Sequence, residues 1–338
     1  MTDLEKLAAV AREAVTKAAV ACRTVQARLD RVRAATKDDR SPVTVADYAS
    51  QAIVCHTLEQ RLGSAFTGAG MVAEEDAAFL REPANASYLQ AALEAAQVVD
   101  PELDTERFLS AIAIGGASGG AGDFWTLDPI DGTKGFLRGE QYAIALSYLS
   151  AGMPVIGVVG APNLPRDPTV ALDSDQREGS LYVAIAGRGA TEGPCLPGAS
   201  ASRRVSPPPP LAGPIRVCAS VEKAHSNVSH TDQVIQAVGA SPDVLRLDSS
   251  AKYVVVARGQ AHAYLRLPTR KDYVERIWDH AAGCVVATEA GCVVSDVDGR
   301  PLDFAHGRGL EKNRGVVVAH PDAHAKLLPA IAQVLAAS

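Results

Sequence analysis

The chain has no apolar run of about 18 residues or more, so no segment is typical of a membrane span. Aromatic residues make up only 5% of its 338 residues, so aliphatic side chains and alanine must fill the core. None of the six cysteines forms a CxxC pair, which argues against a thiolate zinc site. We expect these cysteines to be reduced and mostly buried, as in a cytosol-like compartment.

A basic surface is also missing. The 33 lysines and arginines are outnumbered by 39 acidic residues, giving a net charge of −6. This balance argues against a dedicated nucleic-acid surface but not against a small anionic ligand, because bound cations can reverse the local charge. The first 30 residues mix acids and bases at helical spacing instead of forming the apolar core of a signal peptide. We therefore expect a cytoplasmic monomer that acts on a small molecule, with neither nucleic acid nor a membrane as partner.

The length suggests about two domains. The best boundary is the segment 206–214, Ser-Pro-Pro-Pro-Pro-Leu-Ala-Gly-Pro, because consecutive prolines extend as polyproline II and cannot join a helix. The prediction is an N-terminal α+β domain over residues 1–206, which holds most of the candidate metal ligands, and a C-terminal α/β domain over residues 211–338.

Hydrophobic periodicity predicts the main elements. In the first half we expect helices over 4–35, 44–62, 88–98 and 105–114, and strands over 64–75, 124–127, 142–150, 154–160 and 180–187. The glycine-rich stretch 115–122 lacks the spacing of a phosphate-binding loop and is predicted to be a flexible linker. Between residues 215 and 295 strands and helices are predicted to alternate as α/β units.

Acidic residues gather in three short segments, namely 73–76 (Ala-Glu-Glu-Asp), 125–136 (Trp-Thr-Leu-Asp-Pro-Ile-Asp-Gly-Thr-Lys-Gly-Phe) and 278–283 (Trp-Asp-His-Ala-Ala-Gly). In the middle segment Asp128 and Asp131 are three residues apart, and Pro129 is expected to force a turn between them. Both carboxylates can then point the same way at a strand end. Mg²⁺ commonly binds one or two carboxylates together with water and substrate phosphate.

The residues around these two acids can add further groups. Ile130 can supply its backbone carbonyl oxygen to a cation. The amides of Gly132 and Thr133 begin a new element, so they are free to hold a phosphate oxygen. Asp-Pro and Asp-Gly are also common turn signals, so the spacing alone leaves a second interpretation open, a plain turn that caps a helix.

Three stretches resemble one protein family. The run from Asp128 to Tyr142 (DPIDGTKGFLRGEQY) is similar to the signature of the lithium-sensitive, magnesium-dependent phosphatase superfamily of inositol monophosphatase. It is most similar to one branch, the 3′(2′),5′-bisphosphate nucleotidases. The segment 278–283 resembles the second family signature, and residues 37–47 (KDDRSPVTVAD) resemble its N-terminal loop motif. The stretches follow in the family's order and span nearly the whole chain.

The resemblance implies a fold, a metal site and catalytic groups. The fold would be α+β / α/β, the layered αβαβα sandwich of the inositol monophosphatase-like type. Two or three Mg²⁺ ions would be held by Glu74, Asp128, the carbonyl of Ile130, Asp131 and Asp279. Thr133 and Asp47 would orient and deprotonate the attacking water. Glu75 would hold a further water or be a solvated surface acid.

The resemblance also implies a substrate. Gly132 and Thr133 would contact phosphate, and His225 would pack against adenine. Ser249, Lys252 and Arg266 would hold phosphate groups, with a helix cap as the alternative role of Ser249 and solvated charges as that of the other two.

The implied reaction is hydrolysis of the 3′-phosphate of adenosine 3′,5′-bisphosphate to AMP and phosphate. The enzyme would be inhibited by Li⁺ and would take 3′-phosphoadenylyl sulfate as a second substrate. The alternatives are an inositol (poly)phosphate 1-phosphatase or inositol monophosphatase, and a non-catalytic nucleotide sensor.

Overall fold

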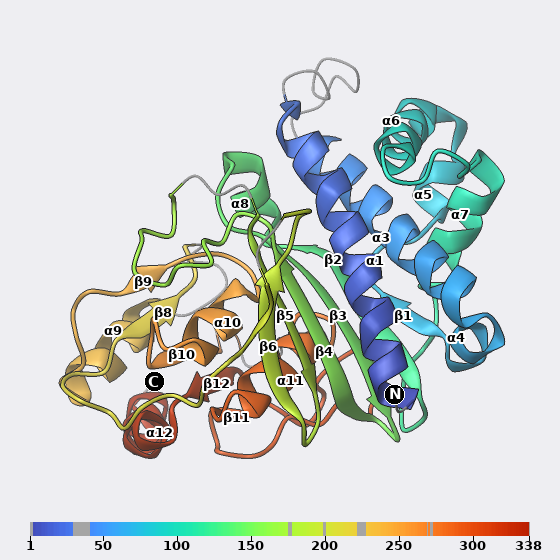
Figure 1. Cartoon of the computed structure of the whole chain (residues 1–338). Helices are drawn as coiled ribbons and strands as arrows, with labels where there is room; N and C mark the ends of the chain where they lie inside the picture. Colours follow the sequence, from blue (N-terminus) through green and yellow to red (C-terminus); the bar gives the residue numbers. More distant parts are fainter. Residues whose placement is uncertain are drawn as a thin grey trace.

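Two β-sheets dominate the computed structural model, which describes residues 3–29, 41–174, 178–198, 201–221, 228–268, 270 and 273–337 (Figure 1). The first sheet has the order β1-β2-β3-β4-β5-β6-β7, and the second has the order β11-β12-β10-β8-β9. The strands of the first sheet are β1 Met71–Ala73, β2 Phe124–Asp131, β3 Ala143–Ser150, β4 Met153–Ala161, β5 Ser180–Ile185, β6 Gly189–Pro194 and β7 Arg203–Arg204. Those of the second are β8 Val217–Ala219, β9 Leu245–Arg246, β10 Ala263–Arg266, β11 Val293–Ser295 and β12 Val316–Ala319.

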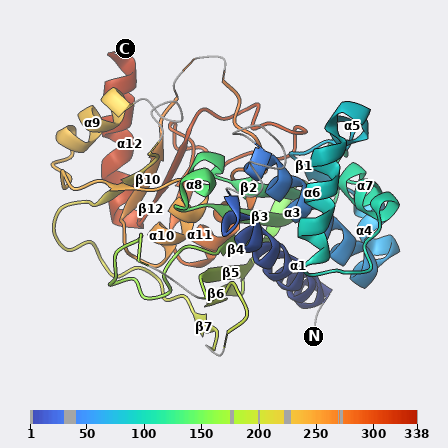
Figure 2. The same ribbon diagram turned by 90° about the horizontal axis from the view of Figure 1, so that it is seen from above.

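The helices form three layers around these sheets. Their bounds are α1 Asp3–Gln26, α3 Ser41–Leu62, α4 Ser64–Ala69, α5 Ala78–Arg81, α6 Ala86–Gln97, α7 Thr105–Ala113, α8 Thr133–Arg138, α9 Val228–Ala237, α10 Ala251–Ala257, α11 Ala281–Glu289 and α12 Pro321–Ala336, with a 3₁₀ turn η1 at Pro83–Asn85. The helices α1 and α3 cover one face of the first sheet, and α10 and α11 lie between the sheets. The helices α9 and α12 close the far side of the second sheet (Figure 2). The predicted αβαβα sandwich is therefore confirmed.

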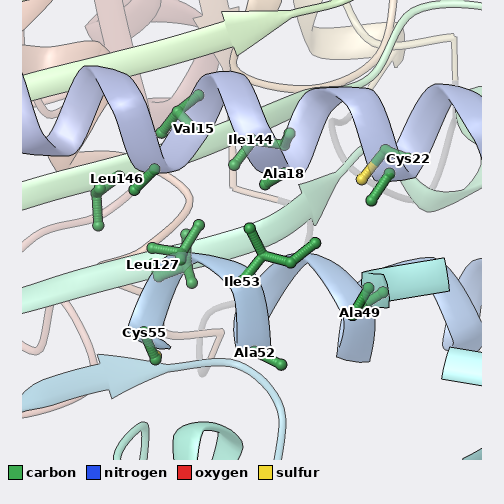
Figure 3. Close-up of a cluster of buried hydrophobic side chains, with 14 of the residues drawn as sticks. Val15, Ala18, Cys22, Ala49, Ala52, Ile53, Cys55, Leu127, Ile144 and Leu146 are labelled. Atoms are coloured by element: carbon green, nitrogen blue, oxygen red, sulfur yellow. The ribbon is translucent and has the colours of Figure 1, made fainter. Parts of the chain in front are cut away.

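Small side chains bring the outer helix pair close to the first sheet. The cluster in Figure 3 joins Val15, Ala18 and Cys22 of α1, Ala49, Ala52, Ile53 and Cys55 of α3, Leu127 of β2, and Ile144 and Leu146 of β3. All of them are almost fully buried. Alanine adds no rotamer entropy cost and lets helix backbones approach, which explains how a core forms with few aromatic residues. The packing fixes α3 beside the end of β2.

The inner helix α11 lies close to the first sheet for a similar reason. A Cβ added at Gly157 of β4 would lie 2.4 Å from the carbonyl oxygen of Ala282 in α11. Only glycine leaves room for this backbone contact. Because α11 begins two residues after Asp279, the contact sets where that acid lies relative to the first sheet.

Several expectations about local structure are settled by the fold. All six cysteines are free thiols, five of them buried and Cys284 half-buried, as predicted. The segment 64–75 was predicted to be one strand and is instead the short helix α4 followed by β1, because Gly70 with its positive φ of 81° ends the helix. The strand β12 and the helix α12 were not predicted.

The glycine-rich stretch 115–122 is not a free linker. Ala73 donates its amide to the Gly115 carbonyl at 2.9 Å, and Ala117 donates to Met71 at 2.9 Å, so the stretch pairs with β1. A Cβ at Gly119 would lie 3.1 Å from the Gly307 carbonyl oxygen. The glycines therefore allow close backbone contacts, which composition alone does not reveal.

The segment 206–214 lies where the chain passes from β7 of the first sheet to β8 of the second. The division into two domains stays a prediction, because α10 and α11 of the second half pack against both sheets. Within the described part of the chain, no helix combines the length and apolarity needed to cross a membrane.

Candidate active site

Two neighbouring strands place the first acids side by side. The strands β1 and β2 are parallel, with Ala73 opposite Leu127, so the next residues, Glu74 and Asp128, lie at the same sheet edge. Their carboxyl groups are close enough to share a hydrogen bond. The first and middle acidic segments of the sequence therefore meet, although 54 positions separate the paired residues Val72 and Thr126.

A β-bulge brings Asp131 to the same place. Side chains three positions apart in a regular strand point to opposite faces. The pairing of β2 with β3 shifts register between Asp128 and Asp131, so two residues of β2, Pro129 and Ile130, face the single residue Ile144. Bulges of this kind re-aim a side chain. Pro129 was expected to make a turn; it makes the bulge, because it has no amide to give the ladder.

The second half of the chain contributes Asp279. This residue follows Trp278 and stands just before α11. The negative charges of Asp279 and Asp131 act on both Glu74 and Asp128. The four predicted carboxylate ligands from β1, β2 and the start of α11 therefore form one cluster, and the carbonyl of Ile130 lies in the bulge between two of them.

The cluster is electrostatically unfavourable without a cation. Desolvation, together with the charges of Asp279, Glu75 and Asp131, raises the pKa of Glu74 to about 8. Burial is the main cause that raises the pKa of Asp279 to about 6, although Arg266 partly opposes it. Burial and the charge of Glu74 raise the pKa of Asp128 well above its usual range. Like charges at close range disfavour ionisation in this way.

One atom indicates what the cluster lacks. The Asp128 Oδ1 atom is buried and has no hydrogen-bond partner among the described residues. Leaving a buried carboxylate oxygen without a partner is costly. A hard divalent cation would satisfy it and would offset the repulsion between the four acids. The donor set therefore fits Mg²⁺.

The predicted catalytic pair is only partly assembled. Asp47 is buried in α3, and burial plus the charges of Glu75 and Glu74 raise its pKa well above the usual range. Thr133 is exposed at the first position of α8. No hydrogen bond joins the two side chains in the described structure, so their joint role stays a prediction. Glu75 is half-buried and hydrogen-bonded to Tyr48, so it is not a solvated surface acid.

Gly132, which follows Asp131, packs closely against Ser249 of the second half of the chain. It adopts the left-handed conformation with φ 90°, and an added Cβ would lie 2.9 Å from the Ser249 Cβ. Glycine is therefore required by both conformation and space. Asp131 also crosses this boundary, because its carboxylate accepts a hydrogen bond from the Ser250 amide.

A pocket of about 120 Å³ opens beside these residues. It is lined by Asp131, Gly132, Asp248, Ser249, Ser250, Lys252, Tyr253, Tyr264, Arg266, Tyr273 and Asp279. Six predicted site residues from both halves of the chain thus share one cavity. His225 and the loop motif residues 37–40 lie outside the described residues.

Three pocket residues from the second half of the chain, Ser249, Lys252 and Arg266, were predicted to bind phosphate. Ser249 has a positive φ of 70°, a conformation that costs a non-glycine residue about 1–3 kcal/mol and is frequent at functional sites. Its hydroxyl accepts a hydrogen bond from the amide of Ala251, the first residue of α10, at 3.2 Å, while the N-cap position itself is Ser250. Lys252 is buried and donates to the Ser249 carbonyl at 2.7 Å, so it is not a solvated charge. Burial lowers the pKa of Lys252, and Asp131 partly opposes the shift.

Arg266 has partners that the sequence did not reveal. Its Nη2 atom lies 2.6 Å from Glu275 Oε2 and 3.5 Å from Asp279 Oδ2. Burial opposes ionisation of Glu275, but hydrogen bonds and the charges of His280 and Arg266 lower its pKa to about 2. Glu275, Asp279 and His280 could hold a metal ion by proximity. However, the guanidinium of Arg266 already supplies a positive charge beside Glu275 and Asp279.

The buried network around Glu275, the ion-pair partner of Arg266, was also not predicted from the sequence. His280 contacts Glu275 Oε2 through Nε2 at 3.3 Å and the Tyr253 hydroxyl through Nδ1 at 2.8 Å. All three are buried. The histidine one position after Asp279 was the only sequence signal for this network. Arg138, beside the first signature, pairs with Glu140 at 2.6 Å and with Asp248.

The raised pKa values predict an effect of pH on stability. In the metal-free folded state the acids keep protons that the unfolded chain has already lost, so the free energy of unfolding falls as pH rises through about 6 and about 8. Mg²⁺ should offset this loss most where the acids are ionised. We expect the Mg²⁺-induced rise in thermal midpoint to be larger near pH 9 than near pH 5, measured against EDTA by fluorimetry. An Mg²⁺ effect that is independent of pH would contradict the assignment of these acids as the Mg²⁺ site.

Comparison with known proteins gives a consistent result. The sequence pattern described as the inositol monophosphatase family matches residues 3–336. A 3′(2′),5′-bisphosphate nucleotidase of Emericella nidulans is 40% identical, with 89% of this chain and 90% of that protein covered. One from Oryza sativa is also 40% identical, with 96% and 92% covered. The inositol monophosphatase structure from Anabaena superimposes with a TM-score of 0.62 at 19% identity, covering 98% and 97%.

Proposed function

The chain belongs to the inositol monophosphatase family, and we propose that it is a magnesium-dependent 3′(2′),5′-bisphosphate nucleotidase. The observation that carries the proposal is a cluster of four carboxylates from both halves of the chain, two of which, Asp131 and Asp279, line a pocket together with the cationic side chains of Lys252 and Arg266. A phosphate monoester brings negative charge to such a site. To bind that charge, the site requires metal cations on one side of the phosphate group and fixed positive side chains on the other.

The acid cluster is the proposed metal site. Glu74, Asp128, the Ile130 carbonyl, Asp131 and Asp279 would hold two or three Mg²⁺ ions. Bound Mg²⁺ neutralises phosphate charge and makes water a better nucleophile at neutral pH. The experiment on Asp128 described below tests this assignment.

The chain's own groups would position the reactants. Asp47 would accept a proton from the attacking water, with the Thr133 hydroxyl orienting it. The amides of Gly132 and Thr133 would contact the phosphate oxygens. Lys252 would place a fixed charge beside the phosphate, and Arg266 would present the part of its guanidinium that Glu275 does not engage.

The substrate is proposed to be adenosine 3′,5′-bisphosphate. The pocket of about 120 Å³ has room for a phosphate group but not for a nucleoside. A second pocket of about 770 Å³ adjoins it at Asp248, which lines both. The nucleoside would extend toward this larger space. Water would add to the 3′-phosphorus, and the bond to the 3′-oxygen would break to give AMP and phosphate.

The other readings of the sequence are weaker. The curated relatives at 36–40% identity carry the nucleotidase name, whereas the solved inositol monophosphatases are near 19% identity and inform only on the fold. A sensor without activity would be expected to have lost a metal-binding acid or Thr133, and this chain has all of them. The compound 3′-phosphoadenylyl sulfate is a second proposed substrate, because it carries the same 3′-phosphate.

A direct comparison of substrates tests the proposal. We expect Mg²⁺-dependent phosphate release from adenosine 3′,5′-bisphosphate to exceed that from inositol 1,4-bisphosphate by about 10²-fold or more in kcat/KM, since a site built for one set of polar groups rejects others strongly. Chromatography of the nucleotide products should give 5′-AMP and no 3′-AMP. A preference for the inositol substrate would keep the metal site but overturn the nucleotide assignment.

A further inference from the structure

Arg308 lies in a segment that pairs with residues 275–277, which directly precede Trp278 and Asp279. Its carbonyl oxygen accepts a hydrogen bond from the Ile277 amide at 3.2 Å. Leu310 donates its amide to the Glu275 carbonyl at 2.8 Å, and Gly309 forms a bridge with Arg276. The backbone of residues 308–310 is therefore fixed to the stretch that leads into Trp278 and the acid after it.

The Arg308 side chain reaches in the other direction, to the first half of the chain. Its Nη1 atom donates to the Ala117 carbonyl at 3.1 Å, and Nη2 donates to the Ala73 carbonyl. Ala73 is the last residue of β1 and directly precedes Glu74. Ala117 belongs to the glycine-rich stretch that pairs with β1. The guanidinium thus holds the strand end that presents Glu74.

The same guanidinium also contacts the second half of the chain. Its central carbon lies 4.8 Å from the centre of the Trp278 ring. Trp278 is buried and directly precedes Asp279. One planar group therefore touches the residue before Glu74 and the residue before Asp279. A guanidinium can donate to two carbonyls from two separate nitrogens while its plane stacks on an aromatic ring, and an ammonium group has no such planar fork.

We propose that Arg308 is a positioning residue that sets the distance between Glu74 and Asp279 and thereby the affinity of the acid cluster for Mg²⁺. This inference rests on the proposed metal-dependent function. Residues that orient metal ligands from behind typically change metal affinity by about 10- to 100-fold when they are substituted. Arg308 does not line the substrate pocket, so nucleotide binding should not depend on it directly.

Arg308→Lys tests the inference, because lysine keeps the charge but has one nitrogen in place of the two that reach Ala117 and Ala73, and no plane to stack on Trp278. Titration calorimetry of Mg²⁺ should show binding about 10- to 100-fold weaker than in the wild type. The KM for the nucleotide at saturating Mg²⁺ should stay within about twofold. Arg276→Lys is the matched control, because Arg276 also lies over Trp278, at 5.7 Å, but is exposed. It should bind Mg²⁺ as the wild type does.

The outcomes are distinguishable. Unchanged Mg²⁺ affinity in a folded Arg308→Lys protein would limit Arg308 to a role in the fold and overturn the inference. If this variant does not fold, Arg308→Gln, which keeps a planar donor for one carbonyl, should show the same direction of change. Failure of both to fold would also overturn the inference. A wild-type protein that binds no Mg²⁺ would instead overturn the proposed function itself.

Discussion

Replacing Asp128 with asparagine is expected to lower Mg²⁺-dependent phosphate release by about 10³-fold or more, since cation binding supplies several kcal/mol of transition-state stabilisation and each 1.36 kcal/mol is about tenfold in rate. The Oδ1 atom of Asp128 is buried without a partner in the described structure, at the centre of the acid cluster. An amide at this position keeps the shape of the side chain but not the charge that a cation requires.

The same substitution should leave the metal-free protein as stable as before, or more stable. It removes a carboxyl whose ionised form is disfavoured by burial and by the charges of Glu74, Asp131 and Asp279. In thermal unfolding the variant should therefore lose the stabilisation by Mg²⁺ without losing its own midpoint. Glu106→Gln, at an exposed acid of α7, is the control for a lost negative charge and should behave as the wild type. An Asp128→Asn protein that keeps its activity would exclude the metal assignment.

Asp47→Asn and Thr133→Ala should each lower kcat by about 10²- to 10⁴-fold, the usual contribution of a positioned general base. Both variants should bind Mg²⁺ with nearly wild-type affinity, because neither side chain is among the proposed ligands. Burial, together with the charges of Glu75 and Glu74, raises the pKa of Asp47. Asp47 becomes an effective base only when cations neutralise those neighbours.

A double variant that combines Asp47→Asn with Thr133→Ala shows whether the two side chains act together or contribute to kcat separately. If Thr133 acts through Asp47, the two losses should not add, and the double variant should be about as slow as the slower single one. Additive losses in kcat would show that the two side chains act independently. A loss of Mg²⁺ affinity in Asp47→Asn would instead place Asp47 among the metal ligands.

The individual strands and the acidic segments could be predicted from local pattern, whereas the layered fold and the set of metal ligands came from the family resemblance. Alternating apolar segments indicated the antiparallel strands β3, β4 and β5, and the acidic segments stood at predicted strand or helix ends. The meeting of Glu74 with Asp128 depended on the parallel pairing of β1 and β2, which the sequence does not state. There the family resemblance supplied what periodicity could not.

The remaining features arise from tertiary contacts. The role of Pro129 was misjudged because a bulge needs a partner strand, and only the pairing with β3 reveals it. The partners of Arg266 were missed because Glu275 lies nine positions away on an irregular segment with no periodic signal. Arg308 carries no local signal either, since its importance comes from carbonyl groups in the other half of the chain.

The central claim is that acids from both halves of the chain form a cation site that performs phosphate hydrolysis. The most direct measurement is phosphate release from adenosine 3′,5′-bisphosphate by the wild-type protein, first after treatment with EDTA and then during titration with Mg²⁺. We predict no release without the cation, full recovery with Mg²⁺, and inhibition when Li⁺ is added. Release that persists in EDTA, or none at any Mg²⁺ concentration, would contradict the account.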